Sequence, residues 1–547
     1  MSKFKILAAD KIAEEGLSWV KAQTDAELIN KPGIKEDELA TIVGQADAMV
    51  VRSGVKITRA VLANPGNLKI IARAGVGVDN IDLEAATEKG ILVVNTAAAS
   101  TITTAEHAFT LMMALLRRVG PAYLAMNKGG WDRNKFEGRQ LHGLTLGVVG
   151  FGRIGQTVAE RALAFGMKVV AFDPVYNAEY AFDGKVKMYK DFEAILPLCD
   201  VLTFHVPATP QTLGMLGEKT FHLCKKGVYV VNAARGGIID EKYLITALDS
   251  GQCAGAALDV FTKEPPAADE PLRTHPKVLV TPHLGASTEE AQTAVSVEAM
   301  YACMKYLRGE GIDGAVNAGG IRVDLSPVQK AYVDLATRCA TLIAPMITRG
   351  IAEVTVTVRG SAIAKAAGTI ERASLVALFK DLLGSQVNLI NVVNVAKSRG
   401  IVVKTVVDEG SEEAGSKLTI EIKGPPEATD SKTPAADRVR RIAGCVYSDL
   451  LPRVVEINGY RMDMVPAGPM VLLQNADRPG MIGLIGSEFG NAGLNIADMA
   501  ISRREETTGI TALMTLKLDA PADKAMLDWL SAKPGVLKIA QVVLPKV

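Results

Sequence analysis

Residues 144–155 read LTLGVVGFGRIG, a short apolar run followed by Gly150, Gly152 and Gly155 and then by helix-favouring residues. Glycines between a strand and a helix let the backbone approach a diphosphate, and the helix start offers free N–H groups. Asp173 ends the next apolar run, where its carboxylate can accept ribose hydroxyls and would repel a 2′-phosphate. The stretch therefore predicts a dinucleotide site that favours NAD over NADP. The alternative is a tight turn in an α/β domain that binds no nucleotide.

Apolar runs alternate with helix-length segments around this stretch. Such alternation is typical of parallel strands that helices cover on both faces. We expect a doubly wound parallel sheet built from runs near 144–149, 168–172, 201–205, 228–232, 254–259 and 278–281.

A smaller α/β unit is predicted before this sheet, because four earlier apolar runs each end in small or polar residues. These runs are FKILAAD (4–10), ADAMVVRSG (46–54), LKIIARAG (68–75) and ILVVNTA (91–97). After the larger sheet, a helix is predicted from about 289 to 307, and a glycine-rich hinge follows at 309–320.

Two further units are predicted in the last third of the chain. Residues 320–460 mix strand patterns such as AEVTVTVRG with the helical ASLVALFKDLLG, around a polar segment at 424–436, which indicates an α+β domain. From about 469, strands and helices are expected in the order β-α-β-β-α-β, typical of a ferredoxin-like sheet with two helices on one face.

The composition limits the classes of partner. The 547 residues include 61 Lys and Arg against 60 Asp and Glu, a net charge of +1. Such a balance gives no global attraction for nucleic acid or an anionic membrane, and we expect neither as a partner. The six cysteines lie far apart, and no signal-peptide core opens the chain. We therefore predict a cytoplasmic protein with free thiols and no bound metal.

Three ionisable residues follow successive predicted strands: Arg235, Glu264 and His283. The carboxyl ends of parallel strands meet at one edge of the sheet, so these residues can share one cleft. Hydride transfer from a secondary alcohol needs a base for the hydroxyl proton, which suits histidine. A carboxylate on the other ring nitrogen fixes the tautomer and stabilises the imidazolium, while arginine's planar fork suits a substrate carboxylate.

Each of the three residues also has a purely structural interpretation. Arg235 could be a surface charge, Glu264 a neighbour of a proline-led helix start, and His283 a loop histidine. The other histidines, including His107, are expected to be packed or solvated, and His205 ends a strand where it could line the cofactor cleft.

Five motifs together resemble one family. The runs ARAGVGVDNID (72–82), the glycine triplet with Asp173, VVNAARGG (230–237), AALDVFTKEPP (256–266) and TPHLGAST (281–288) are similar to those of the D-isomer-specific 2-hydroxyacid dehydrogenases. The whole chain resembles the long branch of that family, which implies reversible NAD-dependent oxidation of 3-phosphoglycerate to 3-phosphohydroxypyruvate, the entry step of serine synthesis. Arg235, Glu264 and His283 match its catalytic positions.

The resemblance also implies the domain plan. A flavodoxin-like substrate domain spans 1–100 and 288–315, and an NAD-binding Rossmann domain is inserted at 101–287. An intervening α+β domain at 318–460 and a ferredoxin-like ACT domain at 468–547 follow.

The same resemblance assigns the binding residues. Those expected around the cofactor are Val76, Gly150, Gly152, Arg153, Ile154, Gly155, Asp173, His205, Val206, Pro207, Ala233, Ala234, Arg235, Asp259, His283, Gly285 and Ala286. Those expected around the substrate are Arg52, Ser53, Gly54, Arg73, Gly75, Val76, Asn95 and Arg133, the last of them across a dimer interface.

The residues themselves support part of this substrate assignment. A phosphate needs fixed cations and N–H donors, which Arg52, Ser53 and Gly54 can supply, although Arg52 could equally be a solvated charge at a strand end. The chain departs from the family at 97–99, where three alanines follow Asn95 and Thr96 in place of a proline and a polar or glycine residue. This loss of donors affects the expected phosphate affinity.

The C-terminal unit resembles an ACT domain through residues 475–480 and 493–496, which implies feedback by L-serine. The expected effector residues are Asn475, Asp477, Asn495 and Ile496. A ligand-free dimerisation module is the alternative. In the preceding domain, Arg438, Arg440 and Arg441 could bind an anion or form a solvated helix face.

Two other functions remain open at this point. One is a dehydrogenase of glyoxylate, lactate or a similar acid, with the trailing domains serving assembly. The other is an NADH-sensing binding protein without catalysis. A homodimer or homotetramer is expected in each case.

Overall fold

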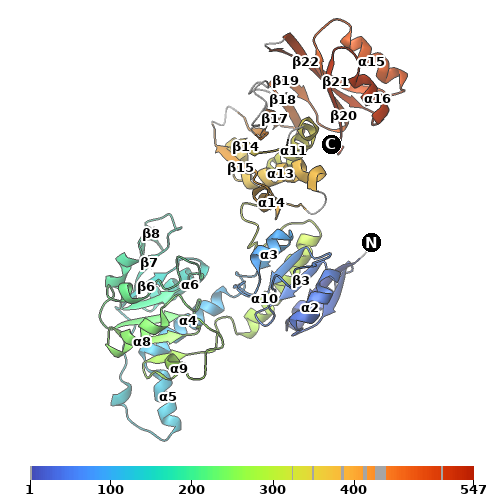
Figure 1. The fold of residues 1–547 in the computed structure, drawn as a ribbon. Helices are drawn as coiled ribbons and strands as arrows, with labels where there is room; N and C mark the ends of the chain where they lie inside the picture. Colours follow the sequence, from blue (N-terminus) through green and yellow to red (C-terminus); the bar gives the residue numbers. More distant parts are fainter. Residues whose placement is uncertain are drawn as a thin grey trace.

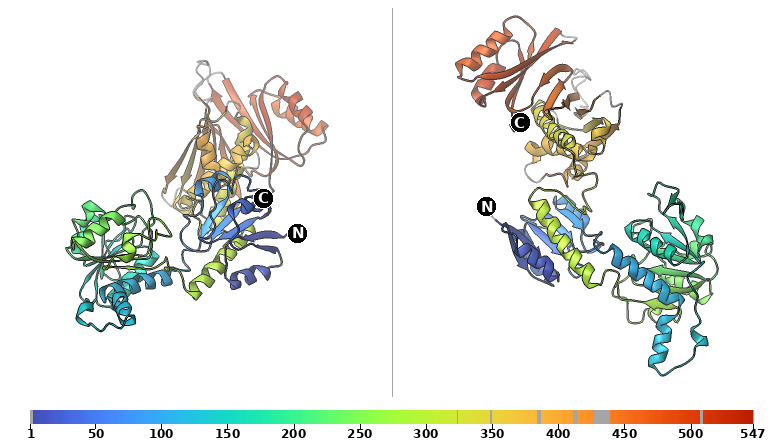
Figure 2. Two further views of the ribbon diagram at one scale, coloured as in Figure 1. Left: turned by 60° about the horizontal axis from the view of Figure 1, so that its bottom comes forward. Right: turned by 180° about the vertical axis from the view of Figure 1, so that it is seen from behind.

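The computed structural model describes residues 3–322, 324–347, 350–383, 387–410, 415–425, 439–506 and 509–546. Four sheets follow one another along the chain. Figures 1 and 2 show the first sheet between the second sheet on one side and the third and fourth sheets on the other. Within the described residues, no helix is long and apolar enough to cross a membrane.

The first sheet has five parallel strands in the order β2-β1-β3-β4-β5. Its elements are β1 (Phe4–Ala8), α1 (Glu14–Lys21), β2 (Ala26–Asn30), α2 (Glu36–Ile42), η1 (Val43–Gln45), β3 (Ala48–Val51), β4 (Ile70–Arg73), α3 (Leu83–Glu88) and β5 (Leu92–Asn95). No strand was predicted at β2, because its AELIN segment has no continuous apolar run. The long helix α10 (Glu289–Leu307) returns to this sheet and packs beside α1, so two separate stretches of chain build this unit.

The second sheet has the order β13-β12-β11-β10-β6-β7-β9-β8. Its strands are β6 (Thr145–Val149), β7 (Lys168–Phe172), β8 (Tyr180–Ala181), β9 (Val186–Tyr189), β10 (Val201–Phe204), β11 (Val228–Asn232), β12 (Cys253–Leu258) and β13 (Val278–Val280). Its helices are α4 (Thr101–Leu116), α5 (Val119–Asn127), η2 (Asn134–Phe136), α6 (Arg153–Ala164), η3 (Glu193–Leu198), α7 (Glu218–Phe221), α8 (Glu241–Asp249) and α9 (Pro271–Thr274).

Six strands of this second sheet were expected, and β8 and β9 extend it. The chain leaves β6 toward β7 on one side and later returns to β10 on the other side. Doubly wound sheets bind their ligands in a crevice outside the carboxyl ends of the strands at such a reversal, which here are β6 and β10.

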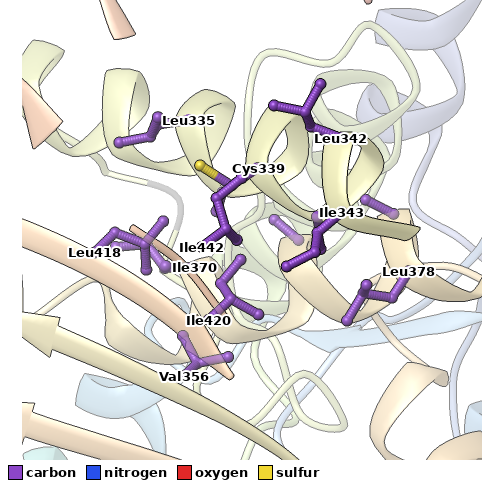
Figure 3. Close-up of a cluster of buried hydrophobic side chains, with 14 of the residues drawn as sticks. Leu335, Cys339, Leu342, Ile343, Val356, Ile370, Leu378, Leu418, Ile420 and Ile442 are labelled. Atoms are coloured by element: carbon purple, nitrogen blue, oxygen red, sulfur yellow. The ribbon is translucent and has the colours of Figure 1, made fainter. Parts of the chain in front are cut away.

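The third sheet, β15-β14-β16-β17-β18-β19, is covered on one face by α11 and α13 (Figure 3). Its elements are α11 (Pro327–Ile343), η4 (Ala344–Met346), β14 (Glu353–Arg359), α12 (Ser361–Ala364), α13 (Ala367–Leu383), α14 (Val392–Ser398), β15 (Val402–Asp408), β16 (Lys417–Lys423), β17 (Val439–Val446), β18 (Pro452–Ile457) and β19 (Tyr460–Met464).

The interpretation of the arginines here as a helix face was wrong. Arg440 and Arg441 lie on β17. The backbone N–H of Arg441 donates to the side chain of Asn458, and its Nε lies 3.5 Å from the carboxylate of Glu456. Arg438 and most of the polar segment at 424–436 lie outside the described residues.

The fourth sheet, β21-β22-β20-β23, is antiparallel throughout and carries two helices on one face. The elements are β20 (Gly468–Ala476), α15 (Met481–Asn491), β21 (Ile496–Glu506), β22 (Gly509–Leu518), α16 (Lys524–Ser531) and β23 (Val536–Leu544). This is the β-α-β-β-α-β order that the sequence predicted.

Candidate active site

The glycine loop lies at the crevice, directly after β6. Gly150 has φ 93°, in the left-handed region that favours glycine, and Gly152 precedes the first residue of α6, Arg153. A Cβ on Gly155 would lie 2.0 Å from the Gly150 carbonyl oxygen, whereas a Cβ on Gly152 would meet nothing within 4 Å. Gly155 therefore lets the helix pack against the loop, and Gly152 borders open space at the start of α6.

Asp173 connects the next strand to this loop. One carboxylate oxygen accepts a hydrogen bond from the backbone N–H of Phe151 at 2.9 Å, and the other accepts from those of Val175 at 2.9 Å and Tyr176 at 3.3 Å. The acid therefore stands beside the glycines at the end of β7. Glycine loop, helix start and carboxylate together form a donor and acceptor set that fits a dinucleotide.

His283 and Glu264 are in direct contact. Nδ1 of His283 lies 2.6 Å from Oε2 of Glu264, and Oε1 of the same carboxylate accepts a hydrogen bond from the backbone N–H of Phe261 at 3.1 Å. The His283 side chain is half exposed, and among the described residues its Nε2 has no hydrogen-bond partner. A base with one nitrogen oriented and the other open suits proton transfer with a ligand.

Asp259, fully buried at the end of β12, shapes the loop that carries His283. Its backbone oxygen accepts from the N–H of His283 at 2.9 Å. Its carboxylate accepts from the N–H groups of Leu284 and Gly285 at 2.8 and 2.9 Å and from the Thr281 hydroxyl at 2.6 Å.

The Asp259 carboxylate also contacts His107 on α4, whose Nε2 lies 3.1 Å away. Burial raises the pKa of Asp259, but the hydrogen bonds from His107, Thr281 and Leu284 hold this pKa below its ordinary value. This contact of His107 was not predicted, because its helical setting resembles that of any packed histidine.

Arg235 lies on the neighbouring loop, after β11. Its Nη1 donates to the carbonyl oxygen of Ala234 at 2.6 Å, and its Nε donates to Asp79 of the first unit at 3.1 Å. Asn232, which the sequence analysis did not single out, shapes this turn by donating to the Arg235 carbonyl at 2.8 Å.

The loop of Arg235 packs tightly on the loop of Glu264. A Cβ on Gly236 would lie 1.9 Å from the Phe261 carbonyl oxygen. No hydrogen bond or ion pair joins Arg235 to Glu264 or His283 within the described residues. The three side chains thus lie on adjacent loops at one edge of the sheet, but Arg235 does not bond directly to the other two.

Asp10, at the end of the first strand, builds the loop of Arg52, Ser53 and Gly54. One carboxylate oxygen of Asp10 accepts from the N–H groups of Arg52 and Gly54 at 3.0 Å each. A Cβ on Gly54 would lie 2.7 Å from the other oxygen, so glycine is needed there. Asn80 also holds the loop by donating to the Arg52 carbonyl at 2.7 Å. The sequence analysis missed Asp10 and Asn80, which act on backbone atoms.

Arg73, Gly75, Val76 and Asn95 lie together at the carboxyl ends of β4 and β5. Asn95 donates to the Val76 carbonyl at 2.6 Å, and the Thr96 hydroxyl accepts from the N–H of Gly75 at 2.8 Å. Burial, followed by the positive charges of Arg235 and Arg52, lowers the pKa of Arg73 to about 10. Arg73 therefore lies near enough to Arg235 and Arg52 for their charges to act on it.

The remaining predicted cofactor residues lie around the crevice. His205 follows β10, its ring 3.0 Å from the Thr203 hydroxyl, and burial lowers its pKa to about 4, so the ring is neutral. Val206 and His205 pack against Gly150. The other members are Ile154 on α6, Pro207 after β10, Ala233 and Ala234 after β11, and Gly285 and Ala286 after β13.

Two groups of predicted site residues lie apart from this cleft. Arg133 is exposed directly before η2, beyond α5, which projects from the second sheet (Figures 1 and 2). Among the effector residues, Asn475 pairs with Ala512 on β22, and Ile496, which follows Asn495, pairs with Leu518. Those β22 positions are about 20 Å apart at the usual rise per residue. Asp477, which bonds to Ile510, and Asn495, which bonds to Asp519, therefore lie far apart within one chain.

Comparison with known proteins extends over the whole chain. Residues 109–285 match the NAD-binding domain of the D-isomer specific 2-hydroxyacid dehydrogenases, and residues 328–458 match the D-3-phosphoglycerate dehydrogenase intervening domain. A D-3-phosphoglycerate dehydrogenase of Methanocaldococcus jannaschii is 37% identical over 541 residues, covering 99% of this chain and 100% of that protein. One of Bacillus subtilis is 36% identical over 544 residues, with 99% and 100% covered.

The first two units also have a solved counterpart. The NAD-dependent formate dehydrogenase of Staphylococcus aureus, crystallised with NAD, superposes with a TM-score of 0.52 at 29% identity, covering 57% of this chain and 99% of that one. The full-length relatives and the two family matches fix the assignment. The chain belongs to the D-3-phosphoglycerate dehydrogenases, NAD-dependent enzymes of the D-isomer-specific 2-hydroxyacid dehydrogenase family.

Proposed function

We propose that this chain catalyses the reversible NAD-dependent oxidation of 3-phosphoglycerate to 3-phosphohydroxypyruvate, the first step of L-serine biosynthesis. The observation that carries this proposal is the 2.6 Å contact of His283 with Glu264 at the sheet edge that also holds the glycine loop. Full-length relatives named for this reaction support the choice of substrate.

The residues divide the reaction between them. The C2–H bond breaks as a hydride leaves, and the hydroxyl proton moves to Nε2 of His283, so the alcohol becomes a ketone. NAD, when bound, supplies the hydride acceptor. Glu264 on Nδ1 orients the imidazole and stabilises the imidazolium that forms. Arg235 pairs with the substrate carboxylate and polarises the C2 oxygen in the reverse direction.

The substrate's phosphate is assigned to the first unit. Arg52 and Arg73 supply cations, and the loop after β3 adds backbone N–H groups. The alanines at 97–99 contribute no side-chain donors, so we expect the arginines to carry most of the phosphate affinity.

A steady-state assay of the full chain tests the substrate. 3-Phosphoglycerate with NAD should give a higher kcat/KM than glyoxylate or D-lactate in the matching directions, and NADP should be the poorer cofactor. A preference for glyoxylate or lactate would make the chain another 2-hydroxyacid dehydrogenase. NADH binding without turnover of any of these acids would instead support the sensor alternative.

We further infer that L-serine is an effector bound by the fourth sheet. Asn475, Asp477, Asn495 and Ile496 carry this proposal, and the separation of the two pairs along β22 means that two chains must join to form the site. Inhibition by serine, and its loss in Asp477→Ala and Asn495→Ala variants that keep full basal turnover, is the expected result. If serine does not inhibit the wild-type enzyme, the proposal fails and the fourth sheet serves as a dimerisation module.

A homodimer or homotetramer is the proposed assembly. Large apolar side chains are exposed on the arm around α5, with Tyr123 63%, Leu124 60% and Trp131 77% accessible, which is typical of a covered face. Arg133 on the same arm would then reach the partner's cleft. Light scattering should give at least a dimer, and a Leu124→Glu variant should shift toward monomer.

The free cysteines support a reducing compartment, and we place the protein in the cytoplasm.

A further inference from the structure

We propose that Asp79 is a positioning residue that holds the guanidinium of Arg235 by its Nε edge and so presents its Nη edge to the substrate carboxylate. The inference rests on the proposed function, because it assigns Arg235 to that carboxylate. Asp79 lies in the loop between β4 and α3, and Arg235 follows β11, so the contact joins the first unit to the second.

The geometry fixes the plane of the guanidinium from three sides. Nε donates to the Asp79 carboxylate at 3.1 Å, and Nη1 donates to the Ala234 carbonyl at 2.6 Å. A Cβ on Gly77 would lie 2.0 Å from Nη2 and 2.7 Å from the Asp79 carboxylate. The guanidinium therefore lies against the backbone of Gly77, and a side chain at position 77 would push the end of Arg235 aside.

The donor count shows which edge remains for a ligand. An arginine carries five N–H donors in a rigid fork. Asp79 takes the Nε donor and Ala234 takes one on Nη1, which leaves three, all on the Nη nitrogens. A carboxylate that binds in the bidentate manner must then approach from the Nη end, so Asp79 sets the direction from which the substrate is held.

Stability alone does not account for this ion pair. The Asp79 side chain is 70% exposed, and exposed ion pairs contribute little to the free energy of unfolding. Its charge also opposes binding, since Asp79 stands beside Arg235 in a region where Arg52 and Arg73 attract anions. Simple Coulomb attraction predicts that removing Asp79 strengthens binding of an anionic substrate. Positioning predicts the opposite sign.

Asp79→Asn and Asp79→Ala variants of the full chain separate these two signs. Positioning predicts that kcat/KM for 3-phosphoglycerate falls in both, by about tenfold to a hundredfold in Asp79→Ala, as misplaced catalytic groups generally cause. The smaller loss is expected in Asp79→Asn, which keeps an acceptor for Nε. Asp79→Glu should restore part of the activity. NADH affinity, followed by fluorescence titration, should remain at the wild-type value.

Two comparisons make the assignment specific. Asp25→Asn removes an equally negative residue of the first unit that pairs with Arg308 at 2.8 Å, and it should leave kcat/KM unchanged. In an Arg235→Ala background, adding Asp79→Ala should cause no further loss, because the group to be positioned is gone. A further loss of equal size there would overturn the proposal.

A rise in kcat/KM in Asp79→Asn, or wild-type kcat/KM in Asp79→Ala, would also overturn it. These outcomes are distinct from failure of the proposed function, which would appear first as wild-type inactivity on 3-phosphoglycerate. In that case the same variants are measured for reduction of glyoxylate by NADH, because its carboxylate still requires Arg235.

Discussion

His283 holds its backbone at φ 54°, in the left-handed region that non-glycine residues rarely adopt. Such a conformation costs on the order of 1–3 kcal/mol and persists only where neighbouring groups impose it. Here the Asp259 carbonyl accepts the His283 N–H, and the Asp259 carboxylate binds the next two N–H groups. The strained loop orients the imidazole toward Glu264.

Replacement of His283 by Ala should lower kcat by roughly two to four orders of magnitude, because the general base for the hydroxyl proton is lost. NADH binding should survive, as measured by fluorescence titration, since the glycine loop is unchanged. His222→Ala is the matched control: this exposed histidine contacts Tyr243 and lies outside the cleft. A wild-type kcat in His283→Ala would remove the residue from the mechanism.

His205 gives a prediction about pH. Burial lowers its pKa in the folded protein to about 4, so between pH 6.5 and 4 the unfolded chain binds a proton that the folded chain does not. The contribution of neutral His205 to the free energy of unfolding is therefore complete above pH 6.5. It is lost as the pH falls toward 4, by a few kcal/mol.

Urea unfolding of the apo protein at pH 7.0 and 4.5 measures this loss. A His205→Asn variant, whose amide can still bond the Thr203 hydroxyl, should lose less stability over the same interval. Equal losses in the two proteins would show that His205 titrates normally.

Sequence patterns single out charged groups that lie in recognisable motifs, such as Arg235 and Asp173, whose roles stay predictions. Reasoning of this kind says little about their spatial partners. It missed residues that act on backbone atoms or across the two units. Asp10 binds N–H groups of a loop 42 residues away, and Asp79 meets Arg235 across 156 residues. No local pattern reports such partners, because either acid alone resembles a solvated surface residue.

The turn from β6 into α6 allows a prediction for an element. Gly155→Ala should destabilise the second unit by about 1–3 kcal/mol, because its Cβ would meet the Gly150 carbonyl at 2.0 Å and the helix must shift. Gly152→Ala should leave the melting temperature near the wild-type value, since nothing lies within 4 Å of its Cβ.

Cofactor affinity should follow a different order in these variants. Gly152→Ala should weaken NADH at least about tenfold, equivalent to about 1.4 kcal/mol, by filling the space that the diphosphate needs. Calorimetry and NADH titration on the same samples check both parts. Unchanged NADH affinity in Gly152→Ala would mean that the diphosphate lies elsewhere.

Sequence patterns predicted elements well where a segment held one continuous apolar run. The runs at 68–75 and 91–97 became β4 and β5 because their strands are buried on both faces. The edge strands β2 and β8 were missed, since one flank of each faces solvent and no continuous apolar run results. The arginines on β17 were misassigned to a helix because the preceding polar segment hides where the strand begins.

At the scale of the whole molecule, polar side chains join the units. Asn388, before α14, donates to the Gly90 carbonyl of the first unit at 2.8 Å, which links the third sheet's domain to the first. Arg338 on α11 links the third sheet's domain to the fourth. Its Nη1 donates to the carbonyls of Pro466, in the connection between β19 and β20, at 2.8 Å and of Pro545, after β23, at 2.7 Å.

Arg338→Met should destabilise this C-terminal pair of domains by about 3–5 kcal/mol, because the side chain is 5% exposed and its loss leaves the carbonyls of Pro466, Pro545 and Lys546 without their donor. Arg359→Met is the matched control, since that arginine pairs with Asp408 on an exposed surface. Calorimetry should show the transition of the C-terminal pair moving down in temperature in Arg338→Met alone, while kcat at 25 °C stays at the wild-type value because the catalytic loops lie in the first two units. If both variants melted alike, the fourth sheet would depend on its own packing and the polar contact would contribute nothing to holding it in place.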